Sequence, residues 1–161
     1  MGVYAGIVMP DAPALFSRVD LGVVSFESTD TWRFFPMDGR IVGRPTNGVG
    51  VLQIVRMPAG TVPPPASHER CMAAAKEASG CDHPGPGSNR AKDHEENCMA
   101  GGESFDVGED FVRVWYRYCP DGMVAAWYAC PVDRAKERSV ARAICECDRM
   151  MATVSLPPPT V

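Results

Sequence analysis

The chain has 161 residues, of which 45% are hydrophobic and 22% are charged, and its formal net charge at pH 7 is −4. This length and composition are those of a single globular domain, residues 1–161, with enough apolar content to bury a core. The acidic balance argues against nucleic acid as the partner, because phosphate binding needs a basic face. No apolar run approaches the ~20 residues of a membrane-spanning helix, so no membrane span is expected.

The N-terminal third of the chain predicts an antiparallel meander. Residues 1–18 are interpreted as a short strand at residues 3–9 followed by a linker. Four further strands are expected, at residues 21–26, 32–35, 41–44 and 49–57. Asp38-Gly39 is typical of a two-residue hairpin turn and joins the second of these strands to the third.

A change of composition after residue 57 predicts a connector and then a helix at residues 66–79. Ser67 is a suitable N-cap, and Gly80 favours the left-handed conformation that ends many helices. Residues 80–102 are rich in Gly, Pro, Asn and charge and predict a long irregular loop, with a short helical turn at 91–99. Residues 103–107 are expected to form a short strand.

Residues 111–130 read as a hairpin with Asp121-Gly122 at its turn. In that register Tyr116 faces Trp127, on a mainly apolar face that is expected to be the core face. The opposite face carries aromatic side chains beside two arginines. Aromatic residues and arginine are enriched at binding hot spots. A partner-binding site is therefore predicted at Arg113, Trp115, Arg117 and Tyr128, with burial under the 66–79 helix as the alternative.

The long helix expected after Asp133, its predicted N-cap, has one apolar stripe. The stripe is formed by Val140, Ile144, Cys147, Met151 and Val154, at helical spacing. We expect it to cover the Tyr116/Trp127 face of the hairpin. A Pro-rich tail follows at residues 157–161 and cannot continue the helix.

The seven cysteines leave the redox state open. Cys71, Cys81 and Cys98 are the disulfide candidates, as Cys71–Cys81 or Cys81–Cys98, whereas Cys119 and Cys130 do not lie opposite one another in the expected hairpin. The absence of a clear leader predicts a cytoplasmic location, and a periplasmic or secreted location is the alternative if a leader was removed.

No catalytic signature is recognisable, and we expect no cofactor and no enzyme activity. His68, Cys71, Cys81 and His83 combine ligand types that zinc prefers, but their order and spacing match no common zinc module. The sequence therefore favours no metal site and keeps these four residues as weak candidates.

The predicted class is α+β, with a central antiparallel sheet of about six to seven strands covered by the mid-chain and C-terminal helices. This order of elements, with the stretches VVSFESTDTWRFFP, SHERCMAAAKEASG and CDRMMATVSLPPP, resembles the PsbP-like α/β/α sandwich. The resemblance implies binding without catalysis, since photosynthetic accessory subunits and proteins resembling bacterial immunity proteins belong to that superfamily.

The functional hypothesis is a non-enzymatic bacterial protein-binding domain, in its most specific form an immunity protein that neutralises a secreted toxin. The alternatives are a secreted or periplasmic accessory domain stabilised by disulfides, and a small zinc-binding module. The partner is expected to be a protein, and the oligomeric state is left open.

Overall fold

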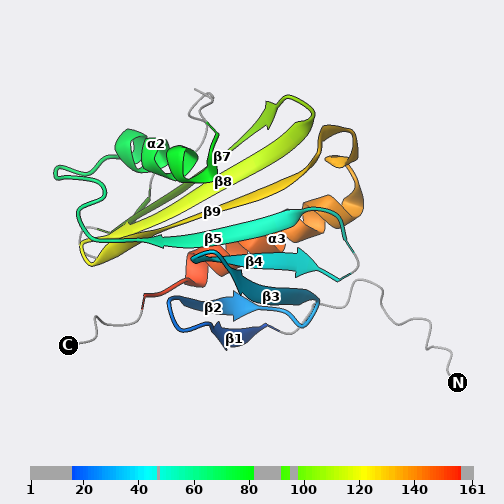
Figure 1. Ribbon diagram of the computed structural model, residues 1–161, viewed down its shortest axis with the longest axis horizontal. Helices are drawn as coiled ribbons and strands as arrows, with labels where there is room; N and C mark the ends of the chain where they lie inside the picture. Colours follow the sequence, from blue (N-terminus) through cyan, green and yellow to red (C-terminus); the bar gives the residue numbers. More distant parts are fainter. Residues whose placement is uncertain (1–15, 47, 82–91, 95–97, 157–161) are drawn as a thin grey trace, which may run out of the picture.

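The structure is a computed structural model that describes residues 16–46, 48–81, 92–94 and 98–156 (Figure 1). Its centre is an antiparallel sheet of seven strands in the order β3-β4-β5-β9-β8-β7-β6. These strands are β3 (Trp32–Met37), β4 (Arg40–Pro45), β5 (Val51–Met57), β6 (Lys92–His94), β7 (Cys98–Val107), β8 (Asp110–Cys119) and β9 (Gly122–Pro131). A separate two-stranded sheet pairs β1 (Ser17–Asp20) with β2 (Ser25–Ser28).

Two helices lie on opposite faces of the large sheet, α2 (His68–Ser79) on one and α3 (Arg138–Thr153) on the other (Figure 1). Each encloses its own apolar core against the sheet, and the smaller core, under α2, includes Cys71, Met72 and Ala75. A short 3-10 turn, η1 (Val132–Arg134), links β9 to α3. The predicted α+β class and the helix-covered antiparallel sheet are confirmed.

The β1–β2 hairpin corrects the strand expected at residues 21–26. Residues 21–24 form the turn of this hairpin: the amide of Leu21 donates to the carbonyl of Val24 at 3.0 Å, and Gly22 has a φ of 88°. Phe26 is fully buried in the core on the α3 side and meets the ring of Phe34 edge-on at 5.1 Å. The hairpin therefore extends the core beyond the edge of the large sheet.

The β3–β4 hairpin is confirmed, together with its predicted turn. Asp38 and Gly39 have φ values of 49° and 79°, as the two-residue turn requires at both central positions. This turn sets Arg33 directly opposite Arg44.

The caps predicted for the mid-chain helix are confirmed. The Ser67 hydroxyl accepts from the amide of Arg70 at 3.2 Å, and Gly80 ends the helix with a φ of 80°.

The central β8–β9 hairpin is shifted by two residues from the expected register. Its turn is Pro120-Asp121, Cys119 pairs with Gly122, and Tyr116 faces Ala125 instead of Trp127. Side chains alternate between faces with a period of two, so a two-residue shift leaves every side chain on its predicted face.

Two local expectations in the middle of the chain are wrong. The short strand β6 (Lys92–His94) replaces part of the helical turn expected at 91–99, and β7 already begins at Cys98, inside the segment expected to be irregular. β7 is therefore twice the length of the strand expected at 103–107, because its two glycines and its alanine were read as loop residues.

The long helix begins later than predicted. Asp133 lies in η1, and α3 starts at Arg138 with Glu137 as its N-cap. The predicted stripe is nevertheless the buried one, with Val140, Cys147 and Val154 at 3% exposure or less. The expectations for the strand at residues 3–9, most of the 80–102 loop and the 157–161 tail lie outside the described residues.

Candidate functional site

The four residues predicted to bind a partner lie on the sheet face that α3 covers. Trp115 is 4% exposed and Tyr128 is fully buried, both in the core beneath α3. The helix expected to cover the other face covers this one, so the open face expected at Arg113, Trp115, Arg117 and Tyr128 does not exist in the structure.

A helix can pack over the arginines on this face because α3 supplies acceptors for their hydrogen bonds. Asp148 Oδ1 accepts from the Trp115 indole at 2.7 Å and from Arg113 Nε at 3.3 Å. Arg117 donates to the carbonyl of Ala152, near the C-terminus of α3, at 3.3 Å. Basic side chains are favourable at that end of a helix because its last carbonyls lack partners.

Tyr128 is held at the same interface by the backbone ahead of β5. Its hydroxyl donates to the carbonyl of Val49, and burial raises its pKa above the usual value for tyrosine. A Cβ atom at Gly50, which has a φ of 99°, would collide with the Tyr128 ring. Tyr128 is therefore a structural anchor for this backbone segment.

The structure corrects the predicted cysteine pairing. Cys98 is in a disulfide, but its partner is Cys119 on the neighbouring strand β8, with Cα atoms 4.4 Å apart. Cys71 and Cys81 are both free thiols. The bridge continues the β7–β8 ladder by one pair beyond Met99 and Tyr118.

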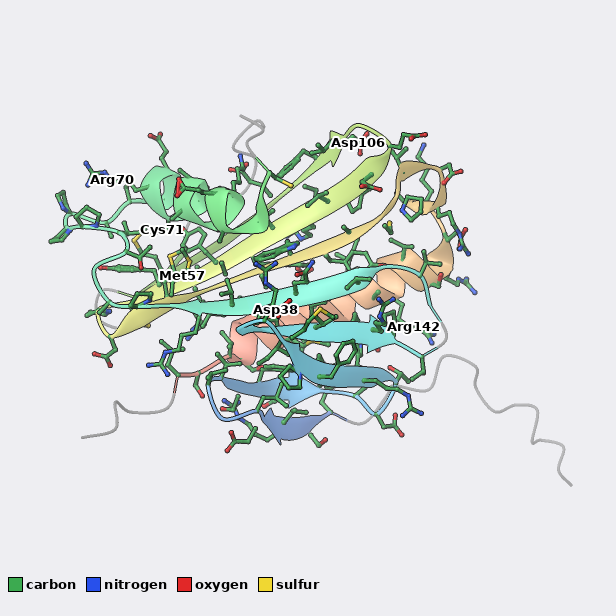
Figure 2. The ribbon with its side chains drawn as sticks, viewed as in Figure 1. Asp38, Met57, Arg70, Cys71, Asp106 and Arg142 are labelled. Carbon is green, nitrogen blue, oxygen red and sulfur yellow. A yellow bond between two sulfur atoms is a disulfide. The ribbon has the colours of Figure 1, made fainter. Side chains whose placement is uncertain are left out.

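His68 and Cys71, two of the weak metal candidates, take part in other interactions. Cys71 is fully buried on the side of α2 that faces the sheet, whereas Arg70 points outward (Figure 2), and burial raises the pKa of the Cys71 thiol to about 11. Among the described residues, no three His, Cys, Asp or Glu side chains are grouped to hold a metal ion, and His83 lies outside them.

A charged cluster that the sequence reasoning missed lies between α2 and the sheet. Lys76 Nζ is 2.7 Å from Glu103 Oε1, and the two side chains are only 12% and 5% exposed. His68 Nδ1 is 2.9 Å from the Tyr116 hydroxyl, and its Nε2 is 3.7 Å from Glu103 Oε2. Gly101 leaves room for this contact, since a Cβ there would lie 2.8 Å from the His68 ring. The cluster neutralises its own charges and fixes α2 on the sheet.

On the α2 side, the helix covers only part of the sheet. α2 packs on β7, β8 and β9, and the strands β3 and β4 extend beyond it (Figure 1). On the α2 side, these two strands carry a set of exposed or half-buried side chains that we call the β3–β4 face. It consists of Arg33, Phe35, Met37, Arg40 and Arg44.

The β3–β4 face combines exposed apolar side chains with cations. Phe35 is 36% exposed and Met37 is 46% exposed, which is high for large apolar side chains. Asp38, labelled in Figure 2, marks the turn at one end of this face.

Of the three arginines, only Arg40 is held in place. It donates to Gln53 at 2.9 Å, and its guanidinium lies 5.4 Å from the centre of the Trp127 ring. Arg33 and Arg44 are exposed and make no hydrogen bond or ion pair with the rest of the described chain.

The sequence did contain a signal for this face. The Asp38-Gly39 turn fixes Arg33 opposite Arg44 by counting outward, and residues two apart then share a face. The central hairpin has the stronger aromatic pattern, which masks this signal.

No protein-family model and no curated protein sequence matches the chain. Among solved structures, it superimposes on cyanobacterial PsbP (CyanoP) from Synechocystis sp. PCC 6803 with a TM-score of 0.55 and 11% identity, over 92% of this chain and 96% of that one. A protein from Bacteroides thetaiotaomicron VPI-5482 matches with a TM-score of 0.49 and 12% identity over 83% of this chain, which spans 45% of that protein. LpqN, described as involved in cell envelope biogenesis of Mycobacterium tuberculosis, matches with a TM-score of 0.47 and 13% identity, over 92% and 94% of the two chains.

The match to CyanoP shows that the chain has the PsbP-like fold, as the order of its elements predicted. Within the described residues, no helix is both long enough and apolar enough to cross a membrane.

Proposed function

We propose that this chain is a non-enzymatic protein-binding domain whose docking surface is the β3–β4 face. The observation that carries the proposal is the exposure of Phe35 and Met37 beside Arg33 and Arg44, two arginines with no ion-pair partner in the described part of the chain. Aromatic residues, Met and Arg are the types enriched in protein interfaces. This surface takes the place of the face first predicted on the central hairpin.

The buried ionisable groups support a binding role over catalysis. The Cys71 thiol, with its pKa near 11, stays protonated at neutral pH and is a poor nucleophile. Lys76 and Glu103 compensate each other beneath α2, where both side chains are largely buried. These groups stabilise the fold, and we assign recognition to the exposed side chains of the β3–β4 face.

Site-specific photo-cross-linking tests the docking surface. A photoreactive side chain placed at Met37 should give one defined adduct in an extract of the producing organism. The same side chain at Ala73, exposed on the outer side of α2, should not. The cross-linked protein, once purified, should bind the native chain and lose most of its affinity for Phe35→Ser/Met37→Ser, but not for Ala73→Ser. Equal affinity for all three chains would refute the β3–β4 face as the docking surface.

The more specific form of the proposal is an immunity protein, in which the bound partner is a toxin. Co-expression with the product of the adjacent gene tests it. The chain should relieve that product's toxicity, and Phe35→Ser/Met37→Ser should not. A non-toxic neighbour, or relief that survives the substitution, counts against this form.

A second candidate is an accessory domain that works in an oxidising compartment, and the Cys98–Cys119 disulfide favours it over the cytoplasmic location first expected. Trapping the thiols in intact cells before lysis distinguishes an oxidising compartment from the cytoplasm. Protection of two cysteines supports an extracytoplasmic location, whereas seven labelled thiols support the cytoplasm.

A further inference from the structure

Arg33 and Arg44 form an unfavourable pair in the isolated chain. They are direct cross-strand partners on the same face of the β3–β4 hairpin, and like charges in that arrangement destabilise a sheet. The other side chains of β3, β4 and β5 on this side of the sheet include no aspartate or glutamate. These side chains belong to Phe35, Met37, Arg40, Val42, Val51, Gln53, Val55 and Met57. The fold therefore supplies no counter-charge to this pair from its own strands.

Protection of a sheet edge does not account for the pair. Charged side chains on an edge strand prevent unwanted strand pairing, and β3 is such an edge. Arg44, however, lies on the inner strand β4, one position beyond the last pair that this strand makes with β5, Gly43–Leu52. Edge protection would be served by Arg33 alone, without the repulsion that Arg44 adds.

The surroundings of the pair fit an acidic polypeptide. Phe35 lies two residues along the strand from Arg33, so apolar contact and charge are side by side on one face. Arg40 is fixed by Gln53 and Trp127 and adds a third cation. We propose that the partner presents an acidic segment whose carboxylates lie between Arg33 and Arg44 and whose apolar side chains contact Phe35 and Met37. This inference rests on the proposed function and adds the chemistry of the partner.

A polypeptide fits better than nucleic acid because the cations are few and are interleaved with apolar side chains, on a chain whose net charge is −4. A nucleic acid is attracted mainly by an extended basic surface, and its affinity grows with the number of phosphates neutralised.

Thermal unfolding of the free protein tests the electrostatic basis of the inference. At low salt, Arg44→Gln and Arg33→Gln should each raise the Tm by about 1–3 °C, and the double variant should gain little beyond either one. The gain should shrink at high salt, because exposed charges are screened. Arg142→Gln, an exposed arginine on α3, is the matched control for the change in net charge and should show no such gain. A lower Tm for either single variant would contradict the repulsion.

Fluorescence anisotropy with a labelled peptide of alternating glutamate and leucine tests recognition directly. The wild-type chain should bind it at least tenfold more tightly than the matching glutamine–leucine peptide. Arg33→Gln/Arg44→Gln should lose about tenfold in affinity, and so should Phe35→Ser/Met37→Ser. Arg138→Gln/Arg142→Gln removes the same charge elsewhere and should bind as the wild type does. Equal anisotropy with the two peptides would overturn the inference.

Three other occupants of the face are separate outcomes that would also overturn it. These are tighter binding to single-stranded DNA than to the acidic peptide, binding to anionic vesicles, and a dimer in sedimentation that Phe35→Ser/Met37→Ser abolishes. A protein captured at Met37 can instead have an affinity that neither salt nor the arginine substitutions change. That result would refute the acidic partner but leave the β3–β4 face as the docking surface. The inference and the proposed function can thus fail separately.

Discussion

Replacing Lys76 by methionine should destabilise the protein by leaving Glu103 without its counter-charge. The Lys76–Glu103 pair is 2.7 Å long, and the Glu103 side chain is only 5% exposed. Methionine keeps most of the apolar stem of Lys76 and removes the ammonium group. The perturbation is therefore mainly electrostatic, with the loss of a contact between the ammonium and the Phe105 ring, at 5.3 Å, as a smaller part.

The magnitude follows from the burial of the pair. Removing one member of a buried pair typically costs about 3–5 kcal/mol because the other charge is left uncompensated, so we expect a loss of about 3 kcal/mol for Lys76→Met.

Urea denaturation of four chains measures this coupling: the wild type, Lys76→Met, Glu103→Leu and the double variant. Glu103→Leu should cost less than Lys76→Met, because Lys76 is 12% exposed and can extend its ammonium to water. The double variant should be more stable than Lys76→Met, since an apolar pair replaces a buried ion pair with little loss. Additive losses in the double variant would refute the idea that Lys76 compensates a buried carboxylate.

Three other predictions concern single structural features. Gly50→Ala should lower the free energy of unfolding, measured by urea denaturation, by more than about 2 kcal/mol and clearly by more than Gly60→Ala does. Both glycines have a φ above 90°, but of the two only Gly50 has a side chain in the way of a Cβ, so equal losses would mean that backbone strain alone matters. Five of the seven thiols should react in denaturant without reductant, and Cys98→Ser should lower stability by about 3 kcal/mol by opening the link to Cys119; seven reactive thiols would exclude the disulfide. Asp148→Leu removes the acceptor of two hydrogen bonds from β8 and should cost about 1–3 kcal/mol in the same assay; an unchanged midpoint would show that those donors find other acceptors.

Local chemistry made part of the fold predictable. The Asp38-Gly39 turn, the caps of α2 at Ser67 and Gly80, and the apolar stripe of α3 each depend on a few adjacent residues. The central hairpin was predicted with the wrong turn, yet each of its side chains kept its face. The reason is that the error was two residues, which is one full period of a strand.

The cover of each sheet face could not be predicted in the same way. The face with Arg113 and Arg117 looked polar by itself, and it becomes a core face only when Asp148 and the last carbonyls of α3 are brought to it from more than thirty residues away. The disulfide was missed for a related reason. Cys98 reaches Cys119 only because β7 begins inside a stretch whose glycines indicate a loop.

Each helix covers the sheet face opposite to the one expected from the sequence, and this arrangement also explains where the candidate surface lies. α3 presents a long stripe of large side chains and occupies the face that carries Trp115 and Tyr128. The short, alanine-rich α2 is left with the opposite face and covers it only over β7, β8 and β9. The strands β3 and β4 extend beyond this cover, and there the chain places Arg33 opposite Arg44. An uncovered surface is thus a consequence of pairing a seven-stranded sheet with one long and one short helix, and in our proposal the cross-strand arginines on it set the chemistry of the partner.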